Sequence, residues 1–281
     1  MKIVFIGSVQ ISQTILEAVY ATGNSVELIL TLPEDSSEKT SGYVDLSPIA
    51  EKNKTTLVRT KNINYKKNIK IIQDLSPDIV IVCGWQRLIC KEIIEIPKMG
   101  AIGFHSSLLP KFRGRAPVNW AIIMGEKETG ITMFYITPGV DDGKIIAQKS
   151  FPILFNDDCG TVYQKAAEAG AQLITDYFPR IADGTAPKLH NESGSYPAYP
   201  KRRPVNGFID FNRSALDVYN FVRALTKPYP GAFYFDKTGR KIMVWKIGIV
   251  FDESRIRDDD IVVKSKDMHI VLLDYEFQKS E

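Results

Sequence analysis

Cysteine is scarce in this chain, and its spacing excludes two common ways of stabilising a fold. The 281 residues include only Cys83, Cys90 and Cys159, and no two of them form a CxxC pair. A sparse, odd count argues against a disulfide framework and a zinc site, and it is typical of a reducing compartment. We therefore expect a cytoplasmic protein without a metal centre.

Long hydrophobic runs, strong net charge and nucleotide-binding fingerprints are absent as well. No apolar run approaches the roughly 20 residues of a membrane span, and the apolar start at residues 1–7 is too short for a signal peptide. A net charge of +3 is too mild to indicate a nucleic-acid binder. The chain has neither a complete GxGxxG motif nor a GxxxxGK[ST] loop. We expect no membrane or nucleic-acid partner and no nicotinamide cofactor.

What is present is an alternation of strand-like and helix-like segments. Amphipathic helical patterns occur at residues 11–20 and 66–75. The runs predicted as strands are residues 2–6, 25–32, 78–82, 101–104, 131–136 and 144–151. This alternation indicates an α/β fold, and we predict a Rossmann-like, doubly wound, mostly parallel sheet. A longer helix at residues 161–178 is expected to end before Pro179.

The texture of the sequence changes after residue 190. Residues 191–206 are rich in Ser, Gly, Pro, Tyr and basic side chains, which indicates a linker. One helical pattern at residues 214–225 and several strand-like segments follow, as in a small, mostly β domain. We therefore predict a large domain at residues 1–190, a linker at 191–206 and a small C-terminal domain at 207–281.

The ends of the predicted strands locate the most informative side chains. Ligands of open α/β sheets bind outside the carboxyl ends of the strands. Three polar segments occupy such ends here: Gly7-Ser8, residues 83–87, and His105 with the turn that follows it. The loop at residues 137–143, which carries Asp141, is a candidate fourth wall.

His105 and Asp141 form a candidate acid–base pair. A histidine at a strand end can exchange protons near neutral pH, and a carboxylate beside it stabilises the imidazolium and fixes the tautomer. The alternatives are a buried histidine with a structural hydrogen bond and a turn aspartate that binds its own backbone. Arg113 and Arg115 could bind an anion or clamp loop carbonyls. We expect a structural role for Arg113 and a ligand-facing role for Arg115.

The residues around His105 and Asp141 resemble the folate-dependent formyltransferases. The matching stretches are His105-x-Ser107-Leu108-Leu109-Pro110-x-x-Arg113-Gly114, Thr129-Gly130-Ile131-Thr132 and Gly139-Val140-Asp141-x-Gly143. Residues 209–211, 220–225 and 228–233 look like the domain that follows the catalytic one in methionyl-tRNA and sugar-nucleotide formyltransferases. The resemblance covers most of the chain.

The resemblance implies transfer of a formyl group from N10-formyltetrahydrofolate to an amine, without a metal. It implies that His105 stabilises the oxyanion and shuttles a proton, and that Asp141 orients His105. It places the folate against Arg87, Leu88, Ile89, Arg115, Thr137, Pro138, Gly139 and Val140. Residues 1–190 are then the catalytic domain.

One position departs from the family pattern. The family usually has Asn two residues before the catalytic histidine, where this chain has Gly103. In the family that Asn is taken to hydrogen-bond the formyl oxygen, and the loss of one oxyanion donor costs about 10²–10³ in rate in other enzymes. Asn119 is a candidate replacement, with another donor or a water as alternatives.

The segment after the second predicted strand bears on the acceptor. Methionyl-tRNA formyltransferases typically carry a basic loop there, whereas this chain has Glu34, Asp35 and Glu38 against Lys39, which would repel phosphate. A nucleotide-linked amino deoxysugar for surface glycan biosynthesis therefore fits best as the small-molecule partner. Ser8, Gln10 and Tyr43 are candidate sugar-nucleotide contacts, and Tyr43 could equally pack on the sheet edge.

Three other functions stay open at this point. They are methionyl-tRNA formyltransferase, a formyltetrahydrofolate hydrolase that uses water as acceptor, and a non-catalytic binder, which Gly103 motivates. The sequence leaves the oligomeric state open, with a homodimer as one candidate.

Overall fold

The computed structural model describes residues 1–192, 194 and 196–278. Ser193 and Ser195 of the predicted linker, and residues 279–281 of the predicted small domain, lie outside the described residues. The chain divides into two compact units. The first unit comprises Met1–Gly114, Thr129–Phe151 and Tyr163–Tyr199, and the second comprises Arg115–Glu128, Pro152–Val162 and Pro200–Glu281.

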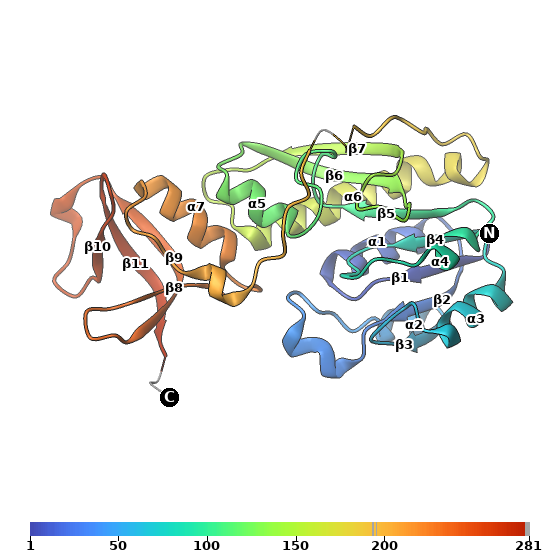
Figure 1. Cartoon of the computed structure of the whole chain (residues 1–281), viewed down its shortest axis with the longest axis horizontal. Helices are drawn as coiled ribbons and strands as arrows, with labels where there is room; N and C mark the ends of the chain where they lie inside the picture. Colours follow the sequence, from blue (N-terminus) through green and yellow to red (C-terminus); the bar gives the residue numbers. More distant parts are fainter. Residues whose placement is uncertain (193, 195, 279–281) are drawn as a thin grey trace. The chain divides into compact units, whose positions relative to one another are not determined.

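A seven-stranded sheet forms the centre of the first unit, with the strand order β3-β2-β1-β4-β5-β6-β7 (Figure 1). The strands are β1 (Ile3–Ile6), β2 (Val26–Thr31), β3 (Thr56–Arg59), β4 (Ile79–Val82), β5 (Ala101–His105), β6 (Glu128–Tyr135) and β7 (Ile145–Pro152). The pairs from β3 to β5 are parallel, and β5 pairs with β6 antiparallel. The predicted α/β fold with a mostly parallel sheet is confirmed.

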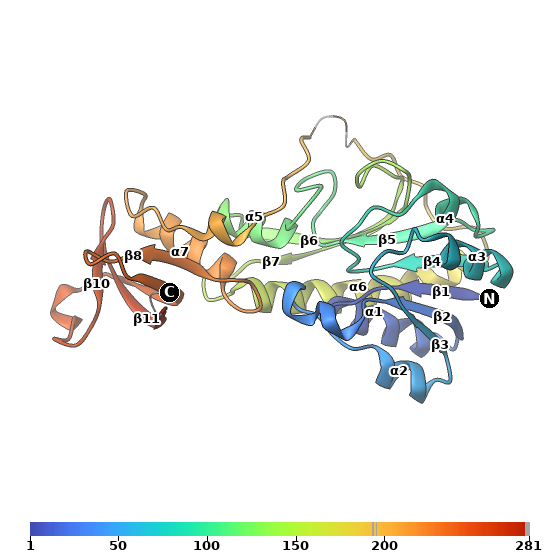
Figure 2. The ribbon, with the colours of Figure 1, turned by 60° about the horizontal axis from the view of Figure 1, so that its bottom comes forward.

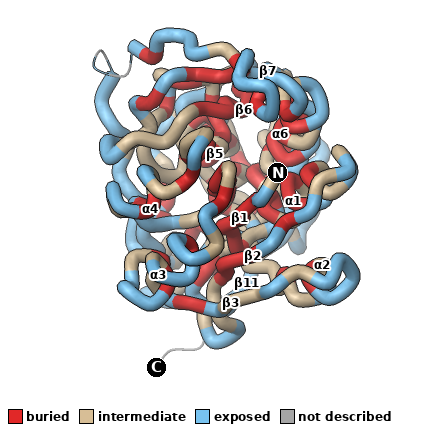
Figure 3. The backbone as a smooth tube through the Cα atoms, turned by 90° about the vertical axis from the view of Figure 1, so that its right-hand side faces the viewer, coloured by how far each residue is buried: buried red, intermediate tan, exposed pale blue. Residues whose placement is uncertain are grey.

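Every residue of the central strands β1 and β4 is buried (Figure 3), because helices cover both faces of this sheet. One face packs against α1 (Gln10–Ala21), α2 (Ser47–Lys52) and α6 (Cys159–Ala182). In α1 the buried side chains Ile11, Ile15 and Val19 recur at helical spacing. The other face packs against α3 (Lys66–Leu75) and α4 (Lys91–Glu95). Figure 2 shows α1 and α6 running along the same side of the sheet.

Helix α6 corrects one expectation. The sequence predicts that it ends before Pro179, but the helix continues through this residue to Ala182. A proline removes one backbone donor and crowds the preceding turn. Pro179 lies only three residues before the last residue of the helix, so few hydrogen bonds are at stake. The chain then turns at Gly184, which has a φ of 77°. The polar segment after β2, predicted as a loop, contains the 3₁₀ helix η1 (Glu34–Lys39).

The second unit combines two helices with an antiparallel sheet. The sheet has the order β10-β11-β9-β8, formed by β10 (Val262–Lys264), β11 (His269–Phe277), β9 (Lys241–Val250) and β8 (Ala232–Phe235). Helix α7 (Ala215–Leu225) is capped by Ser214, whose Oγ accepts from the Asp217 amide at 3.1 Å. Val218 and Val222 of α7 pack in one core with Ile242 and Val244. The unit also contains α5 (Pro117–Ile123) and the 3₁₀ helices η3 (Pro204–Gly207) and η4 (Glu253–Arg255).

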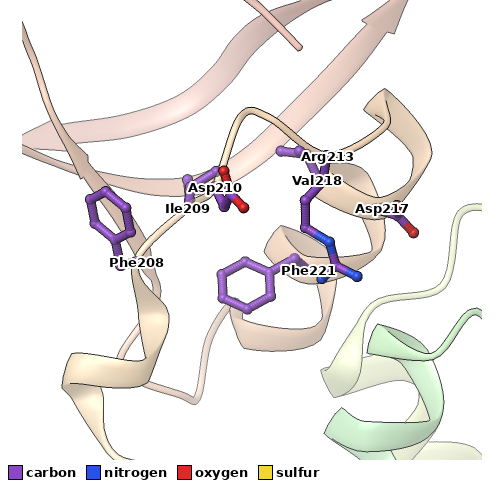
Figure 4. A pocket seen from close by; sticks show the side chains of 7 residues that line it. All are labelled: Phe208, Ile209, Asp210, Arg213, Asp217, Val218 and Phe221. Atoms are coloured by element: carbon purple, nitrogen blue, oxygen red, sulfur yellow. The ribbon is translucent and has the colours of Figure 1, made fainter. Parts of the chain in front are cut away.

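A pocket of about 280 Å³ opens beside α7 in the second unit (Figure 4). Its wall consists of Phe208, Ile209, Asp210, Arg213, Asp217, Val218 and Phe221. Over the part of the chain that the structure describes, no helix combines the length and the hydropathy that crossing a bilayer requires.

Candidate active site

His105 is the last residue of β5 and lies where the carboxyl ends of the parallel strands β1, β4 and β5 meet. Its side chain is almost fully buried. The backbone of β5 pairs there with Thr132 of β6. The strand end predicted as a ligand site therefore places an imidazole in a setting with little water, which strengthens its polar interactions.

Both ring nitrogens of His105 face acceptors. Nε2 lies 2.9 Å from the Phe112 carbonyl oxygen, and Nδ1 lies 3.5 Å from Oδ2 of Asp141. A carbonyl oxygen only accepts, so the hydrogen of this bond resides on Nε2. When Nδ1 is protonated as well, it faces the Asp141 carboxylate. The predicted pairing of His105 with Asp141 is thus present in the geometry, together with a backbone contact that the sequence did not indicate.

A buried hydroxyl fixes the turn that follows His105. Thr132 Oγ1 donates to the Ser107 carbonyl at 2.7 Å and accepts from the Leu109 amide at 3.0 Å. Gln148 Nε2 donates to the same hydroxyl at 2.9 Å and to the Leu109 carbonyl at 2.8 Å. These bonds account for the fully buried hydroxyl of Thr132 within β6.

Asp141 adopts a backbone conformation that side chains rarely occupy, with φ 48°. Its Oδ2 accepts the Gly114 amide at 2.8 Å. Asn191 Nδ2 donates to the backbone carbonyls of Asp141 and Gly143, both at 3.0 Å. The loop that carries Asp141 is therefore held from two sides.

The two predicted arginines differ in setting. Arg113 Nη1 donates to the Val140 carbonyl at 3.4 Å, which fits the expected structural role. Arg115 belongs to the second unit. Its ligand-facing role stays a prediction.

The residues expected at the folate vary in exposure. Arg87 is exposed and Leu88 is 61% exposed, in the segment between β4 and α4. Ile89 is buried among the core side chains that pack against α4, so its side chain is not presented to a ligand. In the loop after β6, Pro138 and Gly139 are exposed, Thr137 and Val140 are half-buried, and Thr137 donates its hydroxyl hydrogen to Asp142.

The three residues expected to contact the sugar nucleotide also differ in exposure. Ser8 is fully buried, and its amide is bound by Ser12 Oγ at 3.1 Å. This burial argues against direct contact between Ser8 and a sugar nucleotide. Gln10 is exposed at the first turn of α1. The half-buried Tyr43 pairs with Val9 through a β-bridge, and no described residue hydrogen-bonds to its buried hydroxyl. Burial raises the pKa of Tyr43, and Asp45 adds to the effect.

Gly103 packs against apolar side chains. A Cβ atom there would lie 3.0 Å from Cγ1 of Ile136 and 3.3 Å from Cε1 of Phe134. Asn119, the expected replacement donor, is buried in the second unit, where its Nδ2 donates to the Ala224 carbonyl at 2.6 Å. We therefore assign Asn119 no oxyanion role.

Sequence reasoning missed three groups around the site: the Phe112 carbonyl, the Gly114 amide and Asn191. The first two are backbone groups, which carry no side-chain signal, although the glycine of the Arg113-Gly114 dipeptide marked an unusual backbone position. Asn191 lies 50 residues from Asp141 in the predicted linker. Among the described residues, no group of three or more His, Cys, Asp or Glu side chains could hold a metal ion.

Comparison with known proteins identifies the family. Residues 1–177 match the formyl transferase family model, and residues 202–280 match the model of the formyl transferase C-terminal domain. Methionyl-tRNA formyltransferase of Caldanaerobacter subterraneus subsp. tengcongensis is 32% identical over 278 residues, which cover 96% of this chain and 88% of that protein. The predicted family and formyltransferase class are confirmed.

Two further relatives extend the comparison. The bifunctional polymyxin resistance protein ArnA of Wigglesworthia glossinidia brevipalpis is 34% identical over 254 residues, which cover 90% of this chain. The chain spans only 38% of that protein's length. The crystal structure of the N-formyltransferase from Helicobacter canadensis, in complex with folinic acid and dTDP-3-aminofucose, superposes with a TM-score of 0.72 at 20% identity. The alignment covers 97% of this chain and 98% of that one, and it confirms the fold.

Proposed function

The chain belongs to the formyl transferase family, and from that premise we propose that it moves a formyl group from N10-formyltetrahydrofolate to the amine of a nucleotide-linked amino deoxysugar. The observation that carries the proposal is the buried His105 with an acceptor at each ring nitrogen and Asp141 as one of them. We place the reaction in the cytoplasm, in the biosynthesis of a surface glycan, by a protein that could act as a homodimer.

The chemistry requires one new bond and one proton relay. The amine nitrogen bonds to the formyl carbon, the bond from that carbon to the folate nitrogen breaks, and a proton moves from the amine to the folate nitrogen. His105 supplies a hydrogen bond to the formyl oxygen as negative charge develops there, and it relays the proton. Asp141 keeps the ring oriented.

The residues expected at the folate fit a flat ring system with an anionic tail. Leu88, Pro138 and Gly139 present apolar surface, and Arg87 adds an exposed cation. We propose that these residues, with Arg115, Thr137 and Val140, bind the donor, and that Ile89 contributes through its backbone. The bound folate supplies the formyl group.

The acceptor assignment rests on charge and on the relatives. Glu34 and Asp35 lie in η1 after β2, with Arg59 and Lys61 as their ion-pair partners, so the segment offers little free positive charge to a polynucleotide. The Helicobacter canadensis protein was crystallised with a nucleotide-linked amino sugar. We propose Gln10 and Tyr43 as contacts to the acceptor. Residues 1–190 would form the catalytic domain, residues 191–206 the linker and residues 207–281 the small domain.

Methionyl-tRNA formyltransferase is the second candidate, because the chain is 32% identical to such an enzyme over 96% of its length. One assay separates the candidates. The protein is incubated with N10-formyltetrahydrofolate and either a panel of nucleotide-linked amino sugars, methionyl-tRNA, or no acceptor, and release of tetrahydrofolate is followed. We expect release that depends on an amino sugar. Release only with methionyl-tRNA supports the second candidate, and release without any acceptor indicates a hydrolase.

A substitution of His105 tests its proposed role in the same assay. We expect His105→Gln to lower kcat by at least about 10³-fold while the circular dichroism spectrum and melting temperature stay near those of the wild type, because the proton relay and oxyanion contact are lost together. His190→Gln, a change at an exposed histidine, is the control. Unchanged turnover in His105→Gln would remove this residue from the mechanism.

A further inference from the structure

Two residues of the predicted linker hold the loops that carry the catalytic groups. We propose that Asn191 and Tyr199 are positioning residues, which fix the protonated nitrogen and the orientation of His105 through the two loops. The inference rests on the proposed roles of His105 and Asp141. All the groups involved lie in the first unit.

Asn191 holds the loop of Asp141. Its side chain is buried, and its amide nitrogen donates to two backbone carbonyls, those of Asp141 and Gly143. Asp141 has a positive φ, which costs free energy for a residue with a side chain and persists only where neighbours enforce it. The two hydrogen bonds from Asn191 bind the carbonyl of that strained residue and the carbonyl two residues further on, so they hold the loop that places the carboxylate beside His105.

Tyr199 holds the loop of Phe112. Its backbone amide donates to the Arg113 carbonyl at 2.8 Å, and its ring packs on the Phe112 ring with centroids 5.2 Å apart at 48°. Phe112 also has a positive φ, 56°. The backbones of Gly114 and Tyr199 are paired so closely that a Cβ on Gly114 would lie 2.6 Å from the Tyr199 carbonyl oxygen. Tyr199 therefore fixes the direction of the Phe112 carbonyl.

The two loops meet at the site itself. The Gly114 amide donates to Asp141 Oδ2, the atom that also faces His105 Nδ1. The charged side chains of these loops are Lys111 and Arg113 in one and Asp141 and Asp142 in the other. Among them, Asp141 is the one ion partner that the described residues place against the imidazole. Moving either loop therefore changes the setting of both His105 nitrogens.

The Phe112 carbonyl has a chemical consequence. As an acceptor at Nε2, it keeps the hydrogen on that nitrogen before any substrate arrives. A developing oxyanion is a stronger acceptor than a neutral carbonyl, so the same hydrogen can pass to the formyl oxygen as charge builds up. An interaction that forms only in the transition state raises kcat rather than affinity.

The first test reads the tautomer of His105 without any substrate. The full chain contains three histidines, so ¹⁵N signals of labelled imidazoles can be assigned with His190→Gln and His269→Gln variants. We expect a hydrogen on Nε2 of His105 in the wild type and in Tyr199→Phe, which keeps the ring. In Tyr199→Ala we expect a mixture of the two tautomers, because the Phe112 carbonyl is no longer held at Nε2. In Asn191→Ala this carbonyl still holds the Nε2 hydrogen, and we expect a changed Nδ1 signal instead, because the Asp141 carboxylate is no longer held beside that nitrogen. An unchanged pair of ¹⁵N signals in both alanine variants would overturn the inference.

The second test is kinetic and uses N10-formyltetrahydrofolate with the amino sugar found active in the acceptor panel. We expect Tyr199→Ala to lower kcat about 10- to 100-fold with KM changed less than about twofold, since a small misplacement of a catalytic group has this effect. Tyr199→Phe should restore kcat. Tyr196→Ala, at an exposed tyrosine of the same segment, is the matched control. A loss confined to KM, or equal losses in the control, would count against positioning.

A folding defect, or a failure of the proposed function, can be distinguished from a failure of the positioning role. Tyr199→Leu replaces Tyr199→Ala if the latter melts below the assay temperature. Because the tautomer measurement needs no acceptor, a failure to transfer formyl groups would refute the proposed function and leave the first test decisive. Transfer by the wild type with no change of tautomer or kcat in the variants would refute the positioning role alone.

Discussion

At the scale of single residues, Gly103 decides what stands beside His105 on its strand. Residues two apart on a strand point to the same face, so a side chain at position 103 would share the face of the imidazole. The space that it would enter is taken by Ile136 and Phe134. The strand therefore offers apolar packing where the family usually offers an amide donor. In the proposed reaction, His105 then supplies the hydrogen bond to the formyl oxygen.

The filled space beside Gly103 predicts the effect of restoring the family residue. Gly103→Asn should destabilise the protein by about 1–3 kcal/mol, because it overpacks a filled region and brings an amide into apolar surroundings. It should not raise kcat. Urea unfolding and steady-state kinetics measure the two quantities. Gly103→Ala, which adds only the Cβ, is the control with the smaller loss. A Gly103→Asn variant that is as stable as the wild type and faster would show that the space accepts the amide.

At the scale of helices and strands, long periodic segments could be predicted and short ones could not. Helix α3 begins and ends at the residues that its apolar spacing indicated, 66 and 75. The helices α2, α4 and α5 have six, five and seven residues, which are too few to show a helical period, so their bounds were not predicted. Pro179 misled because a helix tolerates proline near its end more easily than in its middle.

The candidate site also has parts that could be predicted from the sequence and parts that could not. His105 and Asp141 could be predicted because their types and strand-end positions are visible in the chain. The Phe112 carbonyl could not, because a backbone acceptor is the same in every residue and only its direction matters here. That direction depends on Tyr199, which lies far along the chain and approaches through tertiary structure. Ser8 shows the converse, since a polar residue at a strand end proved to be buried.

The β8–β9 hairpin carries a prediction about pH. Asp236, at its turn, accepts hydrogen bonds from the Thr238 hydroxyl at 2.6 Å and from the Thr238 and Arg240 amides at 2.9 and 3.0 Å. These bonds, with that of the Thr238 side chain as the largest, lower the pKa of Asp236 to about 2. A carboxyl with a lowered pKa stabilises the folded state above its unfolded value of about 3.9, and this contribution is lost as the pH falls toward 2.

The measurement compares Asp236→Asn with the wild type across pH. We expect the variant to melt at a lower temperature at pH 5–7, and the difference to shrink between about pH 4 and pH 2, where the wild-type carboxylate gains its proton. Asp258→Asn, at an exposed aspartate, is the control. A difference in melting temperature that is constant from pH 7 to pH 2 would mean that ionisation of Asp236 does not contribute to the stability of the hairpin.

At the scale of the whole molecule, the two compact units do not follow one another along the chain. The second unit takes Arg115–Glu128 and Pro152–Val162 from within the sequence of the first. Inside that unit, Arg223 of α7 donates to the carbonyls of Leu154 and Asp157 at 3.0 and 2.6 Å, and Phe155 stacks on Tyr219 at 4.6 Å. The core of the second unit is thus completed by segments encoded before residue 163.

A chain that ends at residue 206 should therefore not behave as an independent domain. Its α5 buries Val118, Ala121 and Ile122 completely in the full protein, and its Asn119 would lose the Ala224 carbonyl. Exposed apolar surface of this kind leads to association. We expect the truncated chain to elute as aggregates and to bind a hydrophobic dye, whereas a chain that ends at residue 278 should match the full protein. A monomeric 1–206 fragment that melts cooperatively at the wild-type temperature would show that the first unit folds without these partners.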